Sequence, residues 1–227
     1  MPLSVVIPAL DEAERIGAAV GSARVPGVEV LVVDGGSRDA TPARAAAAGA
    51  RVVACEAGRA RQLAVGAAAA QGDTLLFLHA DSRLPRGFAP AVEAALAAPG
   101  VAGGAFTFRF ERDEGGRLTL GLRLVEWGAR LRVALFALPY GDQALFCRRP
   151  LLEAAGGIPQ VPILEDLDLV RAWKRRGRIV TLPLAVETSP RRYQARGALR
   201  TMLRNWGAAL AWALGADRTR VAAWYRR

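Results

Sequence analysis

The sequence predicts an α/β fold: a mixed, mainly parallel sheet flanked by helices, followed by a C-terminal helix. Short runs of buried-strand residues alternate with helix-like segments through the first half of the chain. This alternation is typical of parallel sheets, because each parallel connection needs a crossover, usually a helix. Three of these runs end abruptly in acidic or turn residues. Polar groups are therefore expected at the carboxyl edge of the sheet, where open α/β folds bind ligands.

Four strand–helix pairs are expected before residue 100. The strands are predicted at residues 3–7, 28–33, 51–54 and 74–78. The helices are predicted from Asp11, from Thr41, over residues 58–71, and from Pro85 to about residue 98. Acidic residues from Asp11 onward suit the first turn of a helix because of the helix dipole. Thr41 is a good N-cap, and Pro42 fits the first helical position.

The pattern changes after residue 100. The later elements are predicted as a strand at 101–110, a polar turn at 112–116, a helix at 118–138, a strand at 143–147, a helix at 165–176, strands at 179–182 and 185–188, and a final helix at 197–215. We therefore expect one α/β domain over residues 1–193. Residues 194–227 are expected to form a helical appendage, packed on that domain or lying at a membrane face.

The chain is strongly basic, with a net charge of +10, and 52% of its residues are hydrophobic, which allows a sizeable core. Nearly all the basic residues are arginines. Such a balance fits a solvated basic surface, an anionic membrane surface or a phosphorylated substrate. No arginine-rich tail or known nucleic-acid motif is present, so no nucleic-acid partner is expected.

The sequence indicates a cytoplasmic protein. Cys55 and Cys147 are the only cysteines and lack CxxC spacing, which favours free thiols in a reducing compartment. The chain opens on a strand without a signal pattern, and no apolar run reaches the length of a membrane span. A peripheral position at the inner membrane face stays open as an alternative.

The first two strands end in groups that can hold a nucleotide. Pro8-Ala9 ends the first strand and leaves backbone groups free to face a ligand. Glu12 can bond a sugar hydroxyl, and Asp34 can accept from a base N–H or a ribose hydroxyl. Glu12 also fits a surface acid in a helix's first turn, and Asp34 fits a turn former before two glycines. No GxGxxG follows the first strand, so a dinucleotide enzyme is not expected.

The next two segments suit a diphosphate and a cation. Gly58, Arg59 and Gln62 open a helix whose backbone N–H groups and guanidinium could hold a diphosphate, although a solvated arginine is the ordinary alternative. Asp81 can give a carboxylate oxygen to Mg²⁺ or Mn²⁺. His79, the only histidine, is a second ligand, a hydrogen-bond partner or a structural residue.

Adjacent carboxylates at Glu165 and Asp166 begin another predicted helix after an apolar approach. One of them could act as a general base. The alternative is a pair of acids that complements the helix dipole.

Taken in order, these segments resemble the family 2 glycosyltransferases, which have the Rossmann-like GT-A fold of nucleotide-diphospho-sugar transferases. The matching segments are SVVIPALDE, VDGGSRDAT, GRARQL, FLHADS, YGDQALFCRR and AGGIP with VPILEDLDL, spanning about residues 3–193. The chain is most similar to a small bacterial subgroup whose metal motif reads His-Ala-Asp. Two departures stand out: His79 replaces a usual aspartate, and Ala64 lies where many members have asparagine.

The resemblance implies a role for each matching position. The nucleotide-sugar would be bound by Pro8, Ala9, Glu12, Asp34, Gly58, Arg59, Gln62, His79 and Asp81, and the metal by Asp81. Asp166, with Glu165 beside it, would be the catalytic base. Tyr140, Gly141 and Asp142 would border the acceptor. Arg191-Arg192-Tyr193 loosely resembles a late basic–aromatic motif that touches the leaving group in some members.

The resemblance implies an inverting, metal-assisted transferase of the hexosyltransferase type. It would move a sugar from a UDP- or GDP-sugar to an acceptor hydroxyl, using Mg²⁺ or Mn²⁺. The acceptor stays open, and a lipid-linked acceptor is among the alternatives. A nucleotidyltransferase acting on sugar phosphates is a rival, although the glycine-rich loop with its basic residue is missing after Ile7. A non-catalytic, basic, membrane-associated nucleotide-binding protein is another, using residues 191–227 with Trp206, Trp212 and Trp224.

Overall fold

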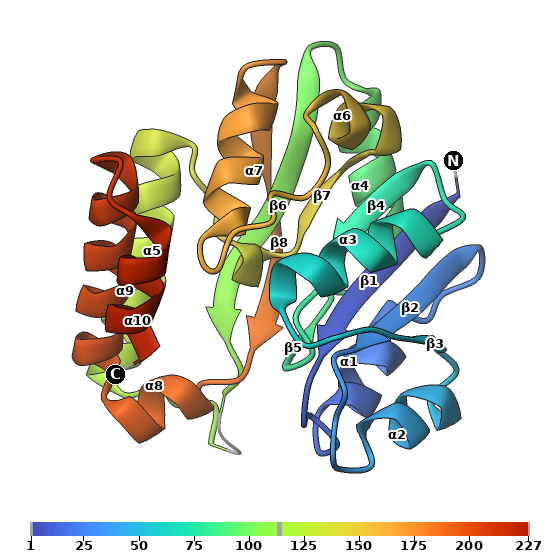
Figure 1. Cartoon of the computed structure of the whole chain (residues 1–227), viewed down its shortest axis with the longest axis horizontal. Coiled ribbons are helices and arrows are strands. Elements are labelled where there is room, and N and C mark those ends of the chain that lie inside the picture. Colours follow the sequence, from blue (N-terminus) through green and yellow to red (C-terminus); the bar gives the residue numbers. More distant parts are fainter. Residues whose placement is uncertain (1, 113–114, 227) are drawn as a thin grey trace.

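The computed structural model describes residues 2–112 and 115–226, so residues 113–114 of the turn expected at 112–116 lie outside the description. Its centre is an eight-stranded sheet of order β3-β2-β1-β4-β7-β6-β8-β5 (Figure 1). The strands are β1 (Leu3–Ala9), β2 (Val28–Asp34), β3 (Arg51–Ala54), β4 (Thr74–Phe77), β5 (Ser82–Arg83), β6 (Val101–Phe110), β7 (Leu145–Arg148) and β8 (Arg178–Thr188).

Strands β1 to β4 are mutually parallel, β7 runs antiparallel to both β4 and β6, and β8 is parallel to β6. The short β5 pairs antiparallel with β8. This confirms the predicted mixed, mainly parallel sheet.

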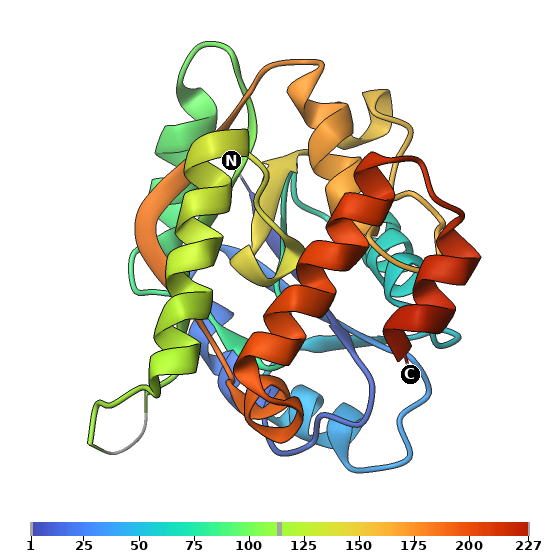
Figure 2. The same ribbon diagram turned by 90° about the vertical axis from the view of Figure 1, so that its left-hand side faces the viewer.

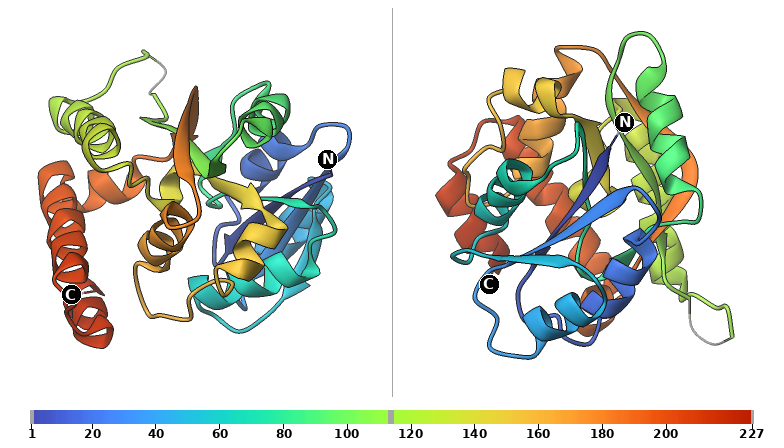
Figure 3. Two further views of the ribbon diagram at one scale, coloured as in Figure 1. Left: turned by 90° about the horizontal axis from the view of Figure 1, so that it is seen from above. Right: turned by 90° about the vertical axis from the view of Figure 1, so that its right-hand side faces the viewer.

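Helices cover both faces of this sheet. They are α1 (Ile16–Ala23), α2 (Thr41–Ala47), α3 (Arg59–Ala69), α4 (Phe88–Ala97), α5 (Leu120–Phe136), α6 (Arg149–Ala154), α7 (Glu165–Lys174), α8 (Arg191–Arg196), α9 (Ala198–Ala213) and α10 (Arg218–Arg226), with a 3-10 turn η1 at Gly141–Gln143. Helices α1 and α2 lie on one side of β1 and β2, and α3 lies on the other (Figure 3, right). Helices α5, α9 and α10 form a group at one end of the molecule (Figure 1, left).

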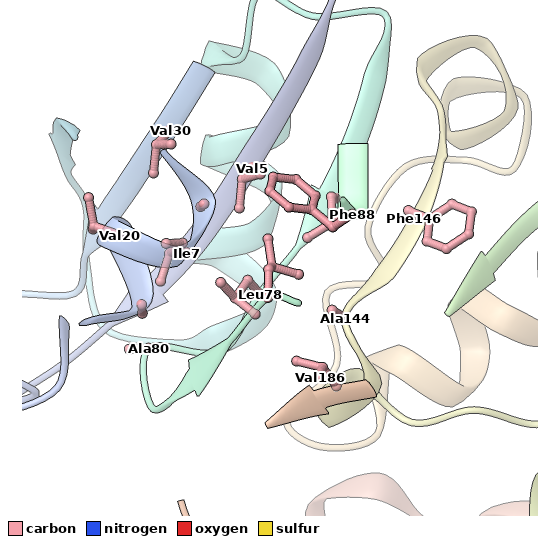
Figure 4. Close-up of a cluster of buried hydrophobic side chains, with 14 of the residues drawn as sticks. Val5, Ile7, Val20, Val30, Leu78, Ala80, Phe88, Ala144, Phe146 and Val186 are labelled. Carbon is pink, nitrogen blue, oxygen red and sulfur yellow. The ribbon is translucent and has the colours of Figure 1, made fainter. Parts of the chain in front are cut away.

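The strands are nearly continuous apolar runs because both faces of the sheet are buried. Side chains alternate along a strand, so neighbours in β1 enter different cores. Val5 and Ile7 pack with residues of α1, α2 and α4, including Val20 and Phe88 (Figure 4). Val6 faces the second core, formed with α3 and α7.

Gly66 lets α3 approach β1 closely. A Cβ atom there would lie 2.2 Å from Val6 Cγ1 and 2.9 Å from Val33 Cγ2. We expect Gly66→Ala to lower the free energy of unfolding by roughly 1–3 kcal/mol through overpacking. Gly21→Ala is the matched control: it lies in α1 with nothing within 4 Å of the added Cβ, so it should raise stability by about 0.5–1 kcal/mol. Urea unfolding curves would measure both. Equal changes in the free energy of unfolding for the two variants would contradict the close packing of α3 on β1.

Two element predictions were wrong in detail, and four elements were missed. The helix predicted from Asp11 begins at Ile16, because Asp11 has a left-handed φ of 53° and its backbone N–H bonds the Ser37 hydroxyl instead. The two late strands are one strand, β8, which skips residues 183–184 in its pairing with β6 and so accommodates Pro183 as a bulge. Helices α6, α8 and α10 and strand β5 were not predicted, since each is short or lacks a clear periodic pattern.

Candidate active site

Two adjoining cavities lie at the carboxyl ends of β1 and β4. The strand-end cavity has a volume of about 680 Å³ and is lined by Pro8, Ala9, Glu12, Gln62 and Asp81, among others. The α7 cavity has a volume of about 550 Å³ and is lined by the start of α7 and by residues of α8, α9 and α10. Both contain Gly58, Arg59, His79 and Arg192 in their walls. A group bound in one cavity would therefore lie next to a group bound in the other.

Glu12 and Asp81 form an acidic pair in the strand-end cavity, and Arg191 is the arginine that lies against both. Arg191 forms an ion pair with Glu12, and its Nη2 lies 3.9 Å from Asp81 Oδ2. Glu12 Oε2 is buried without a hydrogen-bond partner among the described residues. Burial raises the pKa of the Glu12 carboxyl, Arg191 partly offsets this, and the Asp81 carboxylate raises that pKa further. The position between the Glu12 and Asp81 carboxylates therefore favours a positive charge, which the Arg191 guanidinium supplies.

Arg59 and His79 form the boundary between the cavities. Arg59 begins α3 and pairs with the buried Glu165 carboxylate. Its Nη1 lies 3.5 Å from His79 Nε2. Burial, with the nearby Arg59 and Arg192 guanidiniums, lowers the pKa of His79 to about 3. The imidazole is therefore neutral at neutral pH, and Arg59 and Arg192 carry the positive charge at this boundary.

The side chains of Gln62 and Asp34 both form hydrogen bonds within the protein. The buried Gln62 amide donates to the carbonyl oxygens of Ala9 and Val33, at 2.8 Å each, and so ties α3 to β1 and β2. The Asp34 carboxylate accepts from the N–H groups of Gly36 and Ser37 and from the Ser37 hydroxyl. Asp34 lies beside Ala9 at the end of β2 but lines neither cavity. Of the predicted site residues, Asp34 and Gly141 are the two that line neither cavity.

Asp166 faces the α7 cavity from the first turn of α7. Its Oδ2 accepts from the Gly141 N–H at 2.7 Å, and its Oδ1 accepts from the Leu167 N–H at 2.9 Å. A Cβ atom at Gly141 would lie 3.2 Å from both Asp166 Oδ2 and His79 Nε2. Glycine at 141 therefore lets the carboxylate and the imidazole converge at one point.

Tyr140 and Asp142 line the same cavity. The Arg132 guanidinium lies over the Tyr140 ring, 3.3 Å from its centroid. Asp142 Oδ1 is buried without a partner among the described residues. Burial raises the pKa of Asp142, Arg132 partly offsets this, and Asp166 raises it further. Asp142 is thus a half-buried acid with one unpartnered carboxylate oxygen.

The C-terminal helices complete the α7 cavity. Tyr193 of α8, Asn205 of α9 and Tyr225 of α10 all line it. They were not among the predicted site residues, because nothing in the local sequence separates such positions from ordinary helix packing. Only the basic–aromatic run at Arg191–Tyr193 indicated, from the sequence, that this part of the chain lies near the site.

Asp168 anchors these helices to α7. Its carboxylate accepts two hydrogen bonds from Arg218 and one from the Trp212 indole, each 2.7 Å long. Asp168→Asn should weaken this anchor, since hydrogen bonds to charged groups each contribute about 1.5–3 kcal/mol. We expect faster amide hydrogen exchange in α9 and α10, measured by mass spectrometry. Glu153→Gln, an exposed acid on α6, is the control and should leave exchange unchanged. Unchanged exchange in Asp168→Asn would rule out the anchor.

Comparisons with known proteins identify the family. Residues 4–149, well over half of the chain, match the family model Glycosyl transferase family 2. Glucosyl-3-phosphoglycerate synthase of Mycolicibacterium paratuberculosis (strain ATCC BAA-968 / K-10) is 41% identical in an alignment of 92 residues, and the match covers 35% of this chain and 28% of that protein. The chain therefore matches well under half the length of this curated relative.

Solved structures extend the similarity over nearly the whole chain. A crystal structure of glucosyl-3-phosphoglycerate synthase from Mycobacterium tuberculosis, in complex with Mn²⁺, UDP and glucosyl-3-phosphoglycerate, matches with a TM-score of 0.67 and 28% identity, covering 95% of this chain and 80% of that one. A crystal structure described as a mycobacterial protein matches with a TM-score of 0.68 and 30% identity, covering 96% and 76%. The chain belongs to the family 2 glycosyltransferases and is a glycosyltransferase with the GT-A fold.

Proposed function

We propose that this protein transfers a sugar from a UDP-sugar to an acceptor hydroxyl, with inversion at C1 and with the help of Mg²⁺ or Mn²⁺. The observation that carries the proposal is the meeting of two cavities at Arg59 and His79, with the acidic pair on one side and Asp166 on the other. Crystal structures of the similar synthase contain Mn²⁺ with UDP-glucose, or Mg²⁺ with UDP, which supports this choice of donor and cation.

The strand-end cavity is the proposed donor site. Pro8, Ala9 and Glu12 would contact the nucleotide, and Asp34 and Gln62 would shape the backbone around it through the hydrogen bonds they already make. Gly58 and Arg59 open α3, so free backbone N–H groups and a guanidinium face the place of the diphosphate. The N–H dipoles and the Arg59 charge would stabilise the negative charge that develops on the leaving diphosphate oxygen.

The residues present fit a hard divalent cation. Asp81 would hold it, and the unpartnered Glu12 Oε2 provides a second oxygen donor close by. Carboxylate oxygens suit Mg²⁺ and Mn²⁺. When bound, such a cation neutralises charge on the diphosphate. Arg191, which pairs with Glu12 and approaches Asp81, lines the same cavity and would add positive charge beside the diphosphate.

Asp166 is the proposed general base. The acceptor oxygen would attack C1 from the α7 cavity, on the face opposite the leaving diphosphate. The bond from the acceptor oxygen to C1 forms, the bond from C1 to the diphosphate oxygen breaks, and the hydroxyl proton moves to Asp166. Two backbone N–H groups fix the orientation of that carboxylate. Glu165 is paired with Arg59, so we assign it the positioning of that arginine.

The acceptor-side expectations stay predictions. The structure of the similar synthase with phosphoglyceric acid gives no support for a lipid-linked acceptor. Tyr140, Asp142 and Arg192 are the groups that an acceptor would meet in the α7 cavity. A cytoplasmic location is likewise still a prediction.

A thermal-shift panel of nucleoside diphosphates, with and without Mn²⁺, tests the proposal. Ligand at a hundred times its Kd stabilises a protein by about 2.7 kcal/mol, so UDP with Mn²⁺ should raise Tm by roughly 5–10 °C. GDP should give a much smaller shift. A Tm shift with GDP but not with UDP would mean that the donor is a GDP-sugar. The absence of a Tm shift with every nucleoside diphosphate would overturn the proposed function. In a turnover assay, release of pyrophosphate instead of UDP would favour a nucleotidyltransferase.

A further inference from the structure

Helices α5 and α9 carry the same stripe of large apolar side chains. In α5 it consists of Leu120, Leu124, Trp127, Leu131 and Leu135, and in α9 of Leu199, Leu203, Trp206, Leu210 and, at its C-cap, Leu214. The spacing is identical in the two helices. All of these side chains are exposed, from 37% for Leu131 to 78% for Leu214. The buried residues of each helix, such as Val125 and Ala208, lie on its opposite side.

The two stripes form one surface. Gly121 of α5 lies beside Ala198 of α9, and Gly128 lies beside Trp206, where an added Cβ would be 3.3 Å from the indole. The helices therefore run in the same direction and touch at matching heights, on one outer face of the molecule (Figure 2). We call these ten side chains the α5–α9 face. Monomeric proteins rarely expose apolar patches of this extent unless the patch binds something.

The exposed charged side chains of helices α5 and α9 themselves are all arginines. Arg123 and Arg130 of α5 and Arg200 of α9 are exposed. Arg132 and Arg204 are half-buried instead, with Arg132 over the Tyr140 ring and Arg204 donating to α10 carbonyl oxygens. The one acid of the two helices, Glu126, is buried and accepts the Phe110 N–H. The groove of about 770 Å³ beside the face, between α5, α7 and α9, adds Arg171, Lys174 and Arg175. Leucines and tryptophans rimmed by cations, with no exposed acid on either helix, complement an anionic amphiphilic surface.

We propose that the α5–α9 face docks on a lipid bilayer that contains anionic phospholipids. The leucines and tryptophans would enter the boundary between headgroups and acyl chains, and the arginines would contact lipid phosphates. No helix in the described part of the chain is long and apolar enough to span a membrane, so the contact would lie on one leaflet.

A second copy of the chain fits this face less well. A two-fold contact brings the same patch of each copy together. The arginines of α5 and α9 would then face arginines of the partner, and like charges across an interface oppose association. A bilayer with anionic lipids meets both the apolar and the cationic parts of the face.

Docking here would bring the active site close to the lipid surface. Tyr140 lines both the groove beside the face and the α7 cavity. Together with the proposed function, this geometry would give a bilayer-held acceptor a short route to Asp166. The docking itself does not depend on that function.

Co-sedimentation with vesicles tests the docking. We expect the protein to bind vesicles of equal parts phosphatidylcholine and phosphatidylglycerol, to bind phosphatidylcholine alone much more weakly, and to lose binding as salt rises. Arg130→Gln/Arg200→Gln should lower the partition coefficient on the anionic vesicles by at least about tenfold, since each interfacial arginine contributes roughly fivefold. Arg86→Gln/Arg178→Gln makes the same charge change with two exposed arginines outside α5 and α9, and should have little effect.

A second pair of variants tests the apolar part. Trp127→Ser/Leu210→Ser should also lower binding by at least about tenfold, whereas Val25→Ser, an exposed apolar residue after α1, should not. Absence of binding to anionic vesicles, or equal losses in both arginine doubles, would overturn the proposal. So would a dimer in light scattering that Trp127→Ser/Leu210→Ser dissociates. The Tm of each variant without ligand serves as the folding control, and the UDP-induced Tm shift, measured separately, tests the proposed function, so the two failures are distinguishable.

Discussion

Replacement of Asp166 by asparagine is expected to lower kcat by a factor of about 10²–10⁴, the usual contribution of general-base catalysis. Donor affinity should change little, because Asp166 lines the α7 cavity and not the strand-end cavity. Asparagine keeps the size of the side chain, and its amide oxygen can still accept the Gly141 N–H bond. It loses the acceptor for the Leu167 N–H bond, and it loses the capacity to take the acceptor proton. Steady-state kinetics together with calorimetric titration of UDP would measure the two effects separately.

Two neighbouring carboxylates provide the comparison. Asp168→Asn lies in the same turn of α7, but its carboxylate is used to hold Arg218 and Trp212, so its effect on kcat should be far smaller. Asp142→Asn removes the other free acid of the cavity. If Asp142→Asn abolishes transfer while Asp166→Asn keeps it, the base is Asp142. Loss of UDP binding in Asp166→Asn would also contradict the assignment.

The prediction of the fold succeeded where local pattern and long-range packing agree. Strands β1, β2 and β4 are short apolar runs followed by helices, and a sheet buried on both faces needs such runs. It failed at residues 11–15, where acids that suit a helix start instead form a loop. That loop is held by Ser37, Asp39 and Thr41, whose bonds to it span 26 or more residues. No local pattern reports such contacts.

The candidate site could be predicted only in part, for the same reason. Residues at the ends of parallel strands meet at one edge, so Pro8 and Asp81 could be placed together from the order of strands alone. The pairing of Arg191 with Glu12 joins residues 179 apart, and that of Arg59 with Glu165 joins residues 106 apart. Those pairs depend on how α7 and α8 close over the sheet, which periodicity does not encode.

Asp81→Ala is expected to remove the metal dependence of donor binding. Loss of a group that only supports a metal ligand commonly costs about tenfold to a hundredfold in metal affinity, so loss of the ligand itself should raise the Kd for UDP in Mn²⁺ by at least about tenfold. The same variant should bind UDP equally with Mn²⁺ and with chelator. The reason is local: Asp81 and Glu12 form the acidic pair of the strand-end cavity, and without Asp81 the Glu12 carboxylate keeps Arg191 as its partner. Titration calorimetry under both conditions would show this.

The control for Asp81→Ala is Asp73→Ala, an exposed acid just before β4, at the opposite end of that strand from Asp81. It removes the same charge from the chain and should leave both the Kd for UDP and its response to Mn²⁺ unchanged. A wild-type protein that binds UDP equally with Mn²⁺ and with chelator would contradict the cation site before any variant is made. Full transferase activity of Asp81→Ala in chelator would contradict it even if UDP binding fell, because the cation is assigned to the charge of the departing diphosphate.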